Sequence, residues 1–360
     1  MDQVIIPSTH VNAVGLALSL RAIQFKGPII CLAHKAPQNS IAARFPRLCS
    51  VESISMEASA HLPDYLATRF KPAKTGILFT DERHIQQFLT DDRFTYFAGA
   101  GGHLETVCDK LRFYRFLEAQ DLAPTPQSIE STADPFAVFD GAFRSRVWRS
   151  WSGPKRHPRG RLICDRAALE DWQRESLEHG LQPSDWGYQI QLSAKPRDNV
   201  SVVGWHCATM HRSIVTRRIA VASGVGWIVE RVFDLSRLIN IARRVLTALD
   251  FHGPFELEFV RDPVDDTYRV IELNPRFWMQ HRLFQVLTGH AVMKRFLGEQ
   301  VDVKIALDGP SKWLQPDVAL TSPLLALRHA PNALWAHPFN GVIKARAMQK
   351  LKGSSKGLTH

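Results

Sequence analysis

The sequence predicts an α/β protein built from two or three packed subdomains, and three observations carry this prediction. The first hundred residues alternate short apolar strands with a helical stretch, which is typical of a parallel sheet. Residues 255–276 read as two strands with period-two alternation around a turn rich in Asp. The chain of 360 residues is also long enough to bury more than one core.

The N-terminal region is expected to form strands at residues 4–6, 29–32, 76–79 and 95–98, with a helix running to about Gln24. Polar residues follow these strands: Ser8, Thr9, His10, Asn12 and Asp81. Ligands of open α/β sheets often bind at the carboxyl ends of the strands. A GxGxxG motif is absent from the sequence, so a dinucleotide site is not predicted.

The segment 255–276 places acids on one face of a predicted hairpin. Phe255, Leu257 and Phe259 alternate with Glu256 and Glu258, and Ile271 and Leu273 alternate with Glu272 and Asn274. If the hairpin is symmetric about Asp265, Glu258 lies opposite Glu272, with Cβ atoms roughly 4.5–5.5 Å apart. Two carboxylates at that separation repel by about 3 kcal/mol at an effective dielectric of 20. A divalent cation between them would offset this cost, although two acids that merely face solvent stay an alternative.

The end of this hairpin adds an amide and a guanidinium in Asn274-Pro275-Arg276. The pattern E-x-F, an Asp-rich turn, then φ-E-φ-N-P-R resembles the last strands of the ATP-grasp ligases. The resemblance implies that Glu258, Glu272 and Asn274 bind Mg²⁺, or Mn²⁺ in its place, beside the phosphates of ATP. It also implies that Arg276 faces the phosphates or the acceptor substrate as a catalytic residue.

Two upstream segments resemble the entry to the ATP-grasp core. Residues 108–128 read as a helix ending near Asp121 and an extended link with prolines, and the match implies that Lys110 contacts nucleotide phosphates. A solvated helix residue is the alternative for Lys110. Arg149 stands where the family has a strand cation before its phosphate-covering loop. That loop is poor in glycine here, so its closure would depend on Lys155, Arg156 or Arg161.

Two further segments complete the resemblance. Residues 188–192 are similar to the family's hinge strand, which implies that Gln189, Ile190 and Leu192 border the adenine; simple solvation is the alternative for Gln189. Residues 216–219 resemble an R-R element of the carboxylate–amine ligases, and Arg218 is assigned there to phosphate or a substrate carboxylate. An exposed basic residue is the alternative for Arg218. A helix at 235–249 is expected to pack behind the hairpin.

The charge of the chain is unevenly distributed. The formal net charge is +10, but residues 142–161 hold seven Lys or Arg and no acid, and residues 318–360 hold six and no acid. The first cluster lies where an ATP-binding lobe needs cations, and the second reads as a solvated, mobile tail. This local excess disfavours nucleic acid as the partner, although the aromatic and basic residues of 144–161 could stack on single strands.

Cysteine usage and hydropathy point to a cytoplasmic location. The five cysteines are scattered and form no CxxC pair, which indicates reduced thiols and argues against a zinc site. A signal peptide is not expected at the acidic N-terminus, and no apolar run approaches the 18 or so residues of a membrane span.

The sequence therefore predicts an ATP-grasp fold preceded by a Rossmann-like parallel-sheet domain. The expected domains are 1–105 (parallel sheet), 106–195 (linker helix and small lobe), 196–305 (large catalytic lobe with the metal hairpin) and 306–360 (C-terminal extension with a basic tail). The resemblance implies a ligase that joins a small carboxylate to an amine, such as an amino acid, through an acyl phosphate, releasing ADP and phosphate. A carboxylating or carbamoyl-phosphate-forming enzyme, and a non-catalytic nucleotide or nucleic-acid binder, are the alternatives. Oligomeric state stays open, a homodimer included.

Overall fold

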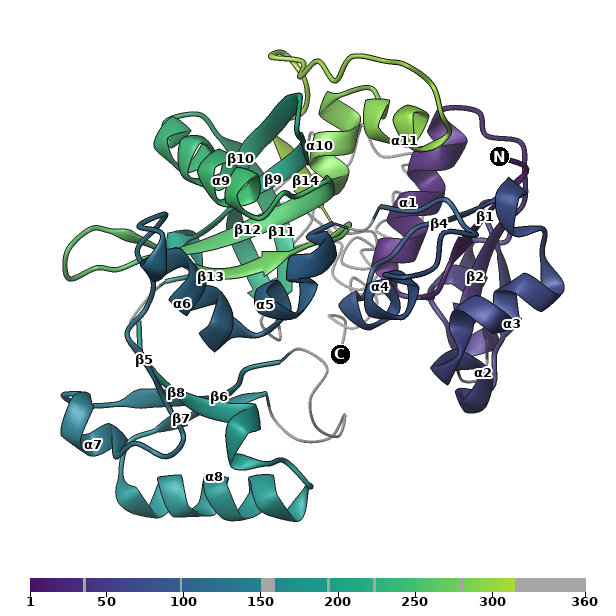
Figure 1. Ribbon diagram of the computed structural model, residues 1–360. Helices are drawn as coiled ribbons and strands as arrows, with labels where there is room; N and C mark the ends of the chain where they lie inside the picture. Colours follow the sequence, from purple (N-terminus) through teal and green to yellow (C-terminus); the bar gives the residue numbers. More distant parts are fainter. Residues whose placement is uncertain are drawn as a thin grey trace, which may run out of the picture.

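The computed structural model describes residues 1–34, 37–97, 99–149, 159–192, 195–222, 225–278 and 281–314. These residues form an α/β architecture with three sheets, as the sequence predicts. Figure 1 shows the N-terminal sheet in purple and blue, a small teal lobe, and a larger, mostly green sheet that comes last along the chain. The predicted basic tail and most of the 306–360 extension lie outside the described residues.

The N-terminal sheet is parallel, in the order β3-β2-β1-β4, which confirms the predicted sheet type. Its strands are β1 (Gln3–Ile6), β2 (Ile29–Ala33), β3 (Ser50–Ser53) and β4 (Thr75–Ile77), and its helices are α1 (Val11–Ala22), α2 (Met56–Ala60), α3 (Leu62–Arg69) and α4 (Glu82–Phe88). Strand β3 escapes prediction because its sequence SVES is polar and only partly buried. The strand expected at 95–98 is wrong in extent, because Thr95 makes only an isolated bridge to Gly76 and Ala98 lies outside the described residues.

The small lobe contains an antiparallel sheet in the order β5-β8-β6-β7. Its elements are β5 (Ser128–Glu130), α7 (Pro135–Val138), β6 (Phe143–Val147), β7 (Gly160–Ile163), α8 (Arg166–Glu178) and β8 (Trp186–Ile190). Helix α8 covers one face of this sheet, because its Trp172 is fully buried against Phe143 and Tyr188 in one apolar cluster. Strand β8 is the predicted hinge strand. It ends at Ile190, two residues before the predicted end at Leu192.

The large lobe is built on a six-stranded sheet in the order β13-β12-β9-β10-β11-β14. Its strands are β9 (Asn199–Cys207), β10 (Met210–Ala222), β11 (Val225–Val232), β12 (Gly253–Arg261), β13 (Tyr268–Asn274) and β14 (Lys312–Leu314), with α9 (Ser236–Ala248) between β11 and β12. Leu238, Val245 and Leu246 of α9 pack against Phe255 and Leu257 of β12. The helix predicted behind the hairpin is thus confirmed.

Two short helices link the N-terminal sheet to the small lobe, α5 (Leu104–Cys108) and α6 (Lys110–Ala119). The Asp109 side chain caps α6 by accepting a hydrogen bond from the Arg112 backbone N–H. This cap makes Lys110 the first residue of α6, and the helix ends close to the predicted position.

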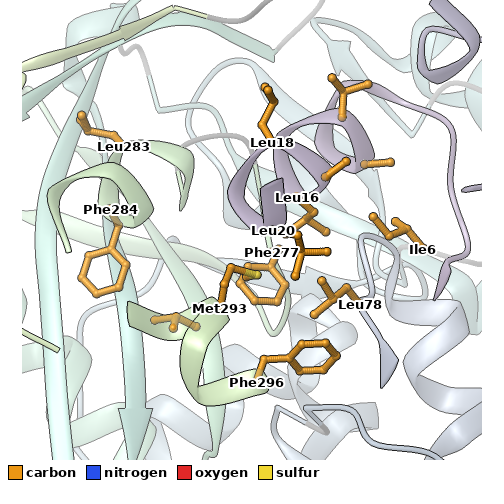
Figure 2. Close-up of a cluster of buried hydrophobic side chains, with 14 of the residues drawn as sticks. Ile6, Leu16, Leu18, Leu20, Leu78, Phe277, Leu283, Phe284, Met293 and Phe296 are labelled. Atoms are coloured by element: carbon orange, nitrogen blue, oxygen red, sulfur yellow. The ribbon is translucent and has the colours of Figure 1, made fainter. Parts of the chain in front are cut away.

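The N-terminal sheet and the large lobe share one core (Figure 2). Leu16 and Leu20 of α1 lie in one cluster with Phe277 and with residues of α10 (His281–Leu287) and α11 (Ala291–Phe296). Figure 2 shows Met293, Phe296 and Phe277 reaching toward Leu16, Leu20 and Leu78. This packing fixes the loops that follow the parallel strands against the end of the hairpin.

All five cysteines carry free thiols, and four of them are buried. No helix among the described residues combines the length and apolarity needed to cross a bilayer.

Candidate functional site

The hairpin β12–β13 brings the predicted acids together in register. Glu258 pairs directly with Glu272, and Glu256 pairs with Asn274. The four side chains therefore share one face of the sheet, while Phe255, Leu257 and Phe259 fill the other. The predicted opposition of Glu258 and Glu272 is confirmed.

The symmetry on which that prediction rested holds for only part of the hairpin. Beyond Glu258 the register shifts, so that Phe259 pairs with Val270 and Ile271 becomes the extra residue of a bulge. The Ile271 carbonyl instead accepts hydrogen bonds from the Tyr114 hydroxyl at 2.9 Å and from Lys110 Nζ at 3.4 Å. The bulge therefore fastens helix α6 to the acidic face.

The two opposed carboxylates, Glu258 and Glu272, each meet a cation. Lys110 Nζ lies 3.0 Å from Glu272 Oε2, and Arg218 Nη2 lies 2.5 Å from Glu258 Oε2. Burial opposes ionisation of Glu272, but Lys110 outweighs it and holds the pKa of this carboxyl below its ordinary value. Glu258 raises the pKa of Arg218, which keeps that guanidinium charged. Lys110 is thus not the solvated helix residue of the alternative interpretation.

Asn274 ties the two acids of β12 together. Its Nδ2 lies 3.3 Å from both Glu256 Oε2 and Glu258 Oε1. Its Oδ1 accepts a hydrogen bond from Arg276 Nη2 at 3.4 Å. The amide oxygen, Glu258 and Glu272 therefore offer oxygen ligands side by side on one strand pair.

Arg276 joins this face to the N-terminal sheet. Its Nε donates to Glu82 Oε1 at 2.6 Å, and its guanidinium carbon lies 4.2 Å from the centre of the Trp278 ring. Both partners of this ion pair are buried, with Glu82 7% and Arg276 8% exposed. Burial opposes the charge of Arg276, but Glu82 outweighs it and raises the pKa. Glu82 lies after strand β4. The polar residues that follow the predicted strands therefore indicated this region, but they did not identify Glu82 as the partner of Arg276.

Glu256 is a buried acid that sequence reasoning did not assign to the site. Its side chain is 0% exposed, and its Oε1 has no hydrogen-bond partner among the described residues. Desolvation, followed by the charge of Glu258, raises the pKa of this carboxyl well above its ordinary value. The available signal was the E-x-E spacing, which puts Glu256 on the same strand face as Glu258.

Glu256→Gln is expected to stabilise the protein at neutral pH. Desolvation raises the pKa of Glu256 in the native state, whereas the unfolded chain ionises it above its ordinary pKa, so wild-type stability falls as pH rises from there toward the raised pKa. The neutral amide removes this pH dependence. At acidic pH, where the Glu256 carboxyl is neutral in both the folded and the unfolded chain, the two proteins should have equal free energies of unfolding. Urea unfolding across pH 4–8 measures the difference. A wild-type advantage that grows with pH would contradict the raised pKa.

The small lobe faces α6 with a buried glutamine and a cation. Gln189 is buried, and its Nε2 donates to the Tyr114 hydroxyl at 3.3 Å, so simple solvation of Gln189 is wrong. Burial raises the pKa of Tyr114 and the charge of Arg146 opposes this rise, while Arg146 adds to the effect of Lys110 in lowering the pKa of Glu272, so the charge of Arg146 lies near the acidic face. Its buried Nε has no hydrogen-bond partner among the described residues. Arg146 was missed because the resemblance directed attention to Arg149.

The structure does not bring every assigned residue to the acidic face. Arg149 Nε lies 3.2 Å from Asp109 Oδ2, so this guanidinium is engaged at the start of α6. Arg161 pairs with Glu175 and lies over Trp172, so its guanidinium is engaged within the small lobe. Ile190 and Leu192 are partly buried at the end of β8. Lys155 and Arg156 lie outside the described residues.

Part of this chain matches a known protein family, and the whole fold is similar to solved structures. Residues 229–308, which include the hairpin, match the family model of the carbamoyl-phosphate synthase L chain, ATP binding domain. The chain is similar in structure to N5-carboxyaminoimidazole synthetase from Staphylococcus aureus, with a TM-score of 0.65, 14% identity, and coverage of 92% of this chain and 86% of that one.

Two further solved structures share the fold. Biotin carboxylase of Campylobacter jejuni, in complex with β,γ-ATP, has a TM-score of 0.62 at 11% identity, covering 84% of this chain and 72% of that one. The biotin carboxylase domain of Hydrogenobacter thermophilus 2-oxoglutarate carboxylase, with MgADP, ADP and bicarbonate, has a TM-score of 0.62 at 12% identity, covering 83% and 70%. A search of curated protein sequences gave no match. The chain therefore has the ATP-grasp fold, and its residues 229–308 match an ATP-binding domain of that superfamily.

Proposed function

We propose that this protein is an ATP-dependent ligase that joins a small carboxylate to an amine through an acyl phosphate. The observation that carries the proposal is the acidic face of the β12–β13 hairpin with its cations. Glu258 and Glu272 lie directly opposite each other, and Lys110, Arg218 and Arg276 surround them. Phosphoryl transfer is catalysed mainly by positioning and charge neutralisation, which such a face supplies.

The residues of this face fit a magnesium ion. No group of three or more His, Cys, Asp or Glu side chains suited to a metal occurs in the described part of the chain. The proposed set has two carboxylates and one amide, Glu258, Glu272 and Asn274, and Mg²⁺ usually completes such a shell with water and substrate phosphates. When bound, Mg²⁺ would neutralise charge on the β- and γ-phosphates. Lys110 and Arg218 now balance the acids that the ion would contact.

Unpaired buried polar atoms support a ligand beside this face. Arg218 Nε, Arg276 Nη1, Arg146 Nε and Gln189 Oε1 are buried without a hydrogen-bond partner among the described residues. Leaving such a group unsatisfied costs roughly 1–3 kcal/mol, so a native protein generally retains it for a ligand or water. Three of these atoms are guanidinium donors, which suits phosphate oxygens.

The residues divide into three tasks in the proposed reaction. Lys110 and Arg146 hold phosphate oxygens, while Gln189, Ile190 and Leu192 border the adenine. Arg276 and Arg218 stabilise charge on the transferring phosphoryl group and the acyl phosphate. Arg149 and Lys155 retain their proposed roles as nucleotide contacts, Arg149 after exchanging Asp109 for phosphate.

The proposed chemistry has two balanced steps. An oxygen of the substrate carboxylate attacks the γ-phosphorus of ATP, the bond to the bridging oxygen breaks, and ADP leaves. The amine nitrogen then attacks the acyl carbon, loses a proton, and expels inorganic phosphate. Guanidinium groups fixed by buried partners, such as Arg276 on Glu82, can stabilise the developing charge without reorganising.

Bicarbonate as the acid is the second candidate, and the names of the similar solved structures suggest it. The similar solved structures are named as a carboxyaminoimidazole synthetase and as biotin carboxylases, and one of them holds bicarbonate. At 11–14% identity, this similarity is evidence of a shared fold. The two candidates share the acidic face and differ in the acid that is phosphorylated.

The test is a screen for ADP release from ATP and Mg²⁺ with pairs of amino acids, small carboxylates, amines and bicarbonate. The expected result is release that requires both an acid and an amine, with a new C–N bond seen by mass spectrometry. Release that requires bicarbonate assigns the second candidate instead. Nucleotide binding without release across the whole panel would leave a non-catalytic binder and reject the proposal.

A further inference from the structure

A pocket between α1 and α10 lies apart from the acidic face and has polar groups without partners. It encloses about 390 Å³ of space that is not occupied by atoms, including open solvent at its mouth. Helix α1 contributes Asn12, Gly15 and Ser19, and helix α10 contributes Arg282 and Gln285. Trp278 lines the pocket and also lies against Arg276, so it borders both sites.

Arg282 is a buried cation at this pocket. It is 8% exposed, and desolvation lowers its pKa to about 10, so it stays charged at neutral pH. Its Nη1 donates to Ser19 Oγ and lies 3.3 Å from His290 Nδ1, but both of these partners are neutral groups. Its Nε is buried without a hydrogen-bond partner among the described residues. An uncompensated buried guanidinium is costly unless an anion completes it.

Gln285 lines the pocket, and the orientation of its amide follows from His281. His281 Nε2 lies 2.9 Å from the Gly204 carbonyl, so Nε2 carries the proton, and desolvation lowers the pKa of this imidazole to about 4. Its Nδ1 is therefore a bare acceptor, and it receives a hydrogen bond from Gln285 Nε2 at 3.2 Å. The Gln285 Oε1 is left as an acceptor, buried and without a partner among the described residues.

The remaining lining adds a second polar acceptor and apolar walls to the pocket. Asn12 Oδ1 is also buried without a partner, on the α1 side of the pocket. Apolar side chains form the walls: Val11, Leu16, Phe277, Trp278 and Trp313. Gly15 leaves room between them, because a Cβ added at this position would meet no atom within 4 Å.

We propose that this pocket binds an amino acid with an apolar side chain, as a substrate of the proposed ligase. The carboxylate completes Arg282 through the free Nε, and the ammonium donates to Gln285 Oε1 and Asn12 Oδ1. The side chain lies against Trp278 and Trp313. One guanidinium is the only charged group lining the described pocket, which matches a monocarboxylate better than a phosphate monoester of charge about −2.

Binding of free amino acids, measured by calorimetry on the full chain without nucleotide, tests the proposal. Leucine, valine and phenylalanine are the probes, and leucinamide and isocaproate are the matched ligands that lack the carboxylate or the ammonium. At least one apolar amino acid should bind. For leucine as that ligand, leucinamide and isocaproate should each bind roughly 10- to 100-fold more weakly, because each leaves a buried polar group unpaired. These ligand-side controls do not depend on the folding of a variant.

Gly15→Leu provides the protein-side test, because it adds bulk to the pocket from α1, where a Cβ meets no atom within 4 Å, and leaves Arg282 itself unchanged. Amino-acid binding should weaken about tenfold or more. Ala22→Leu, at an exposed position on the same helix, is the matched control and should bind as wild type does. Arg282→Gln should also abolish binding, with thermal unfolding reporting whether the variant remains folded.

The outcomes separate this inference from the proposed function. The absence of binding by any apolar amino acid at millimolar concentration would overturn the inference, as would leucinamide binding as tightly as leucine. Competition by inorganic phosphate at equal affinity would overturn it too. Binding without any ADP release counts against the proposed function alone. ADP release whose amino-acid KM is unchanged in Gly15→Leu counts against the inference alone.

Discussion

Replacing Glu272 by Gln is expected to lower ATP-dependent ADP release by roughly 100-fold or more. Glu272 lies opposite Glu258 and holds Lys110 at 3.0 Å, so it borders both the proposed metal and the proposed phosphate cation. The amide keeps the shape of the side chain but loses the charge that Mg²⁺ requires. Initial rates of ADP release against Mg²⁺ concentration measure the effect, and the variant should also need more Mg²⁺ for half-maximal rate.

The control for this substitution is Glu130→Gln. Glu130 is an exposed acid on β5 that pairs with Arg115 at 2.7 Å, so it makes the same kind of ion pair away from the hairpin. Its rate should equal that of wild type. Thermal unfolding of both variants separates a lost site from a lost fold. Near-normal ADP release by Glu272→Gln would rule out Glu272 as a metal ligand.

Arg276→Ala is expected to lower the free energy of unfolding by about 3–5 kcal/mol, because it leaves a buried carboxylate without its partner. Glu82 is among the most buried acids of the N-terminal domain, and Arg276 Nε lies 2.6 Å from it. The double variant Glu82→Leu/Arg276→Met should recover most of this loss, since it removes both charges and keeps apolar volume. Urea unfolding of the single and double variants measures the coupling.

A surface pair provides the matched control. Arg115→Ala removes the guanidinium from an exposed pair with Glu130 and should cost about 1 kcal/mol or less. If Arg276→Ala lowered the free energy of unfolding by as little, the ion pair would contribute little to holding the N-terminal sheet on the large lobe. Arg276→Lys adds a second measurement, because it retains the charge but not the planar fork. A lowered kcat with unchanged stability would indicate that Arg276 also acts on the reacting groups.

The hairpin shows how far local pattern reaches. Alternation of apolar and acidic residues placed Glu258 opposite Glu272, because residues two apart on a strand must share a face. The same reasoning could not locate the bulge at Ile271, since a bulge depends on what the neighbouring helix requires. Here Tyr114 and Lys110 use the carbonyl that the bulge leaves free.

The cations of the small lobe show what the family resemblance left out. The motif pointed to Arg149, yet Asp109 engages it, and Arg146 carries the charge that reaches Tyr114 and Glu272. A match to a sequence motif does not distinguish Arg146 from Arg149, which are three residues apart. The structure separates the two, because Arg146 lies within β6, whereas Arg149 lies beyond its end in an isolated bridge with Asp109.

The sequence by itself determined the parallel N-terminal sheet, the acidic hairpin and the helix behind it. Each of these follows from apolar periodicity within one segment, which sets the face that must be buried. Only the tertiary structure decided the partners of Arg276, Glu256 and Arg282. Those partners come from segments as distant as residues 82 and 276, or 19 and 282. Burial and electrostatic pairing across such distances arise when separate elements pack, so no local pattern encodes them.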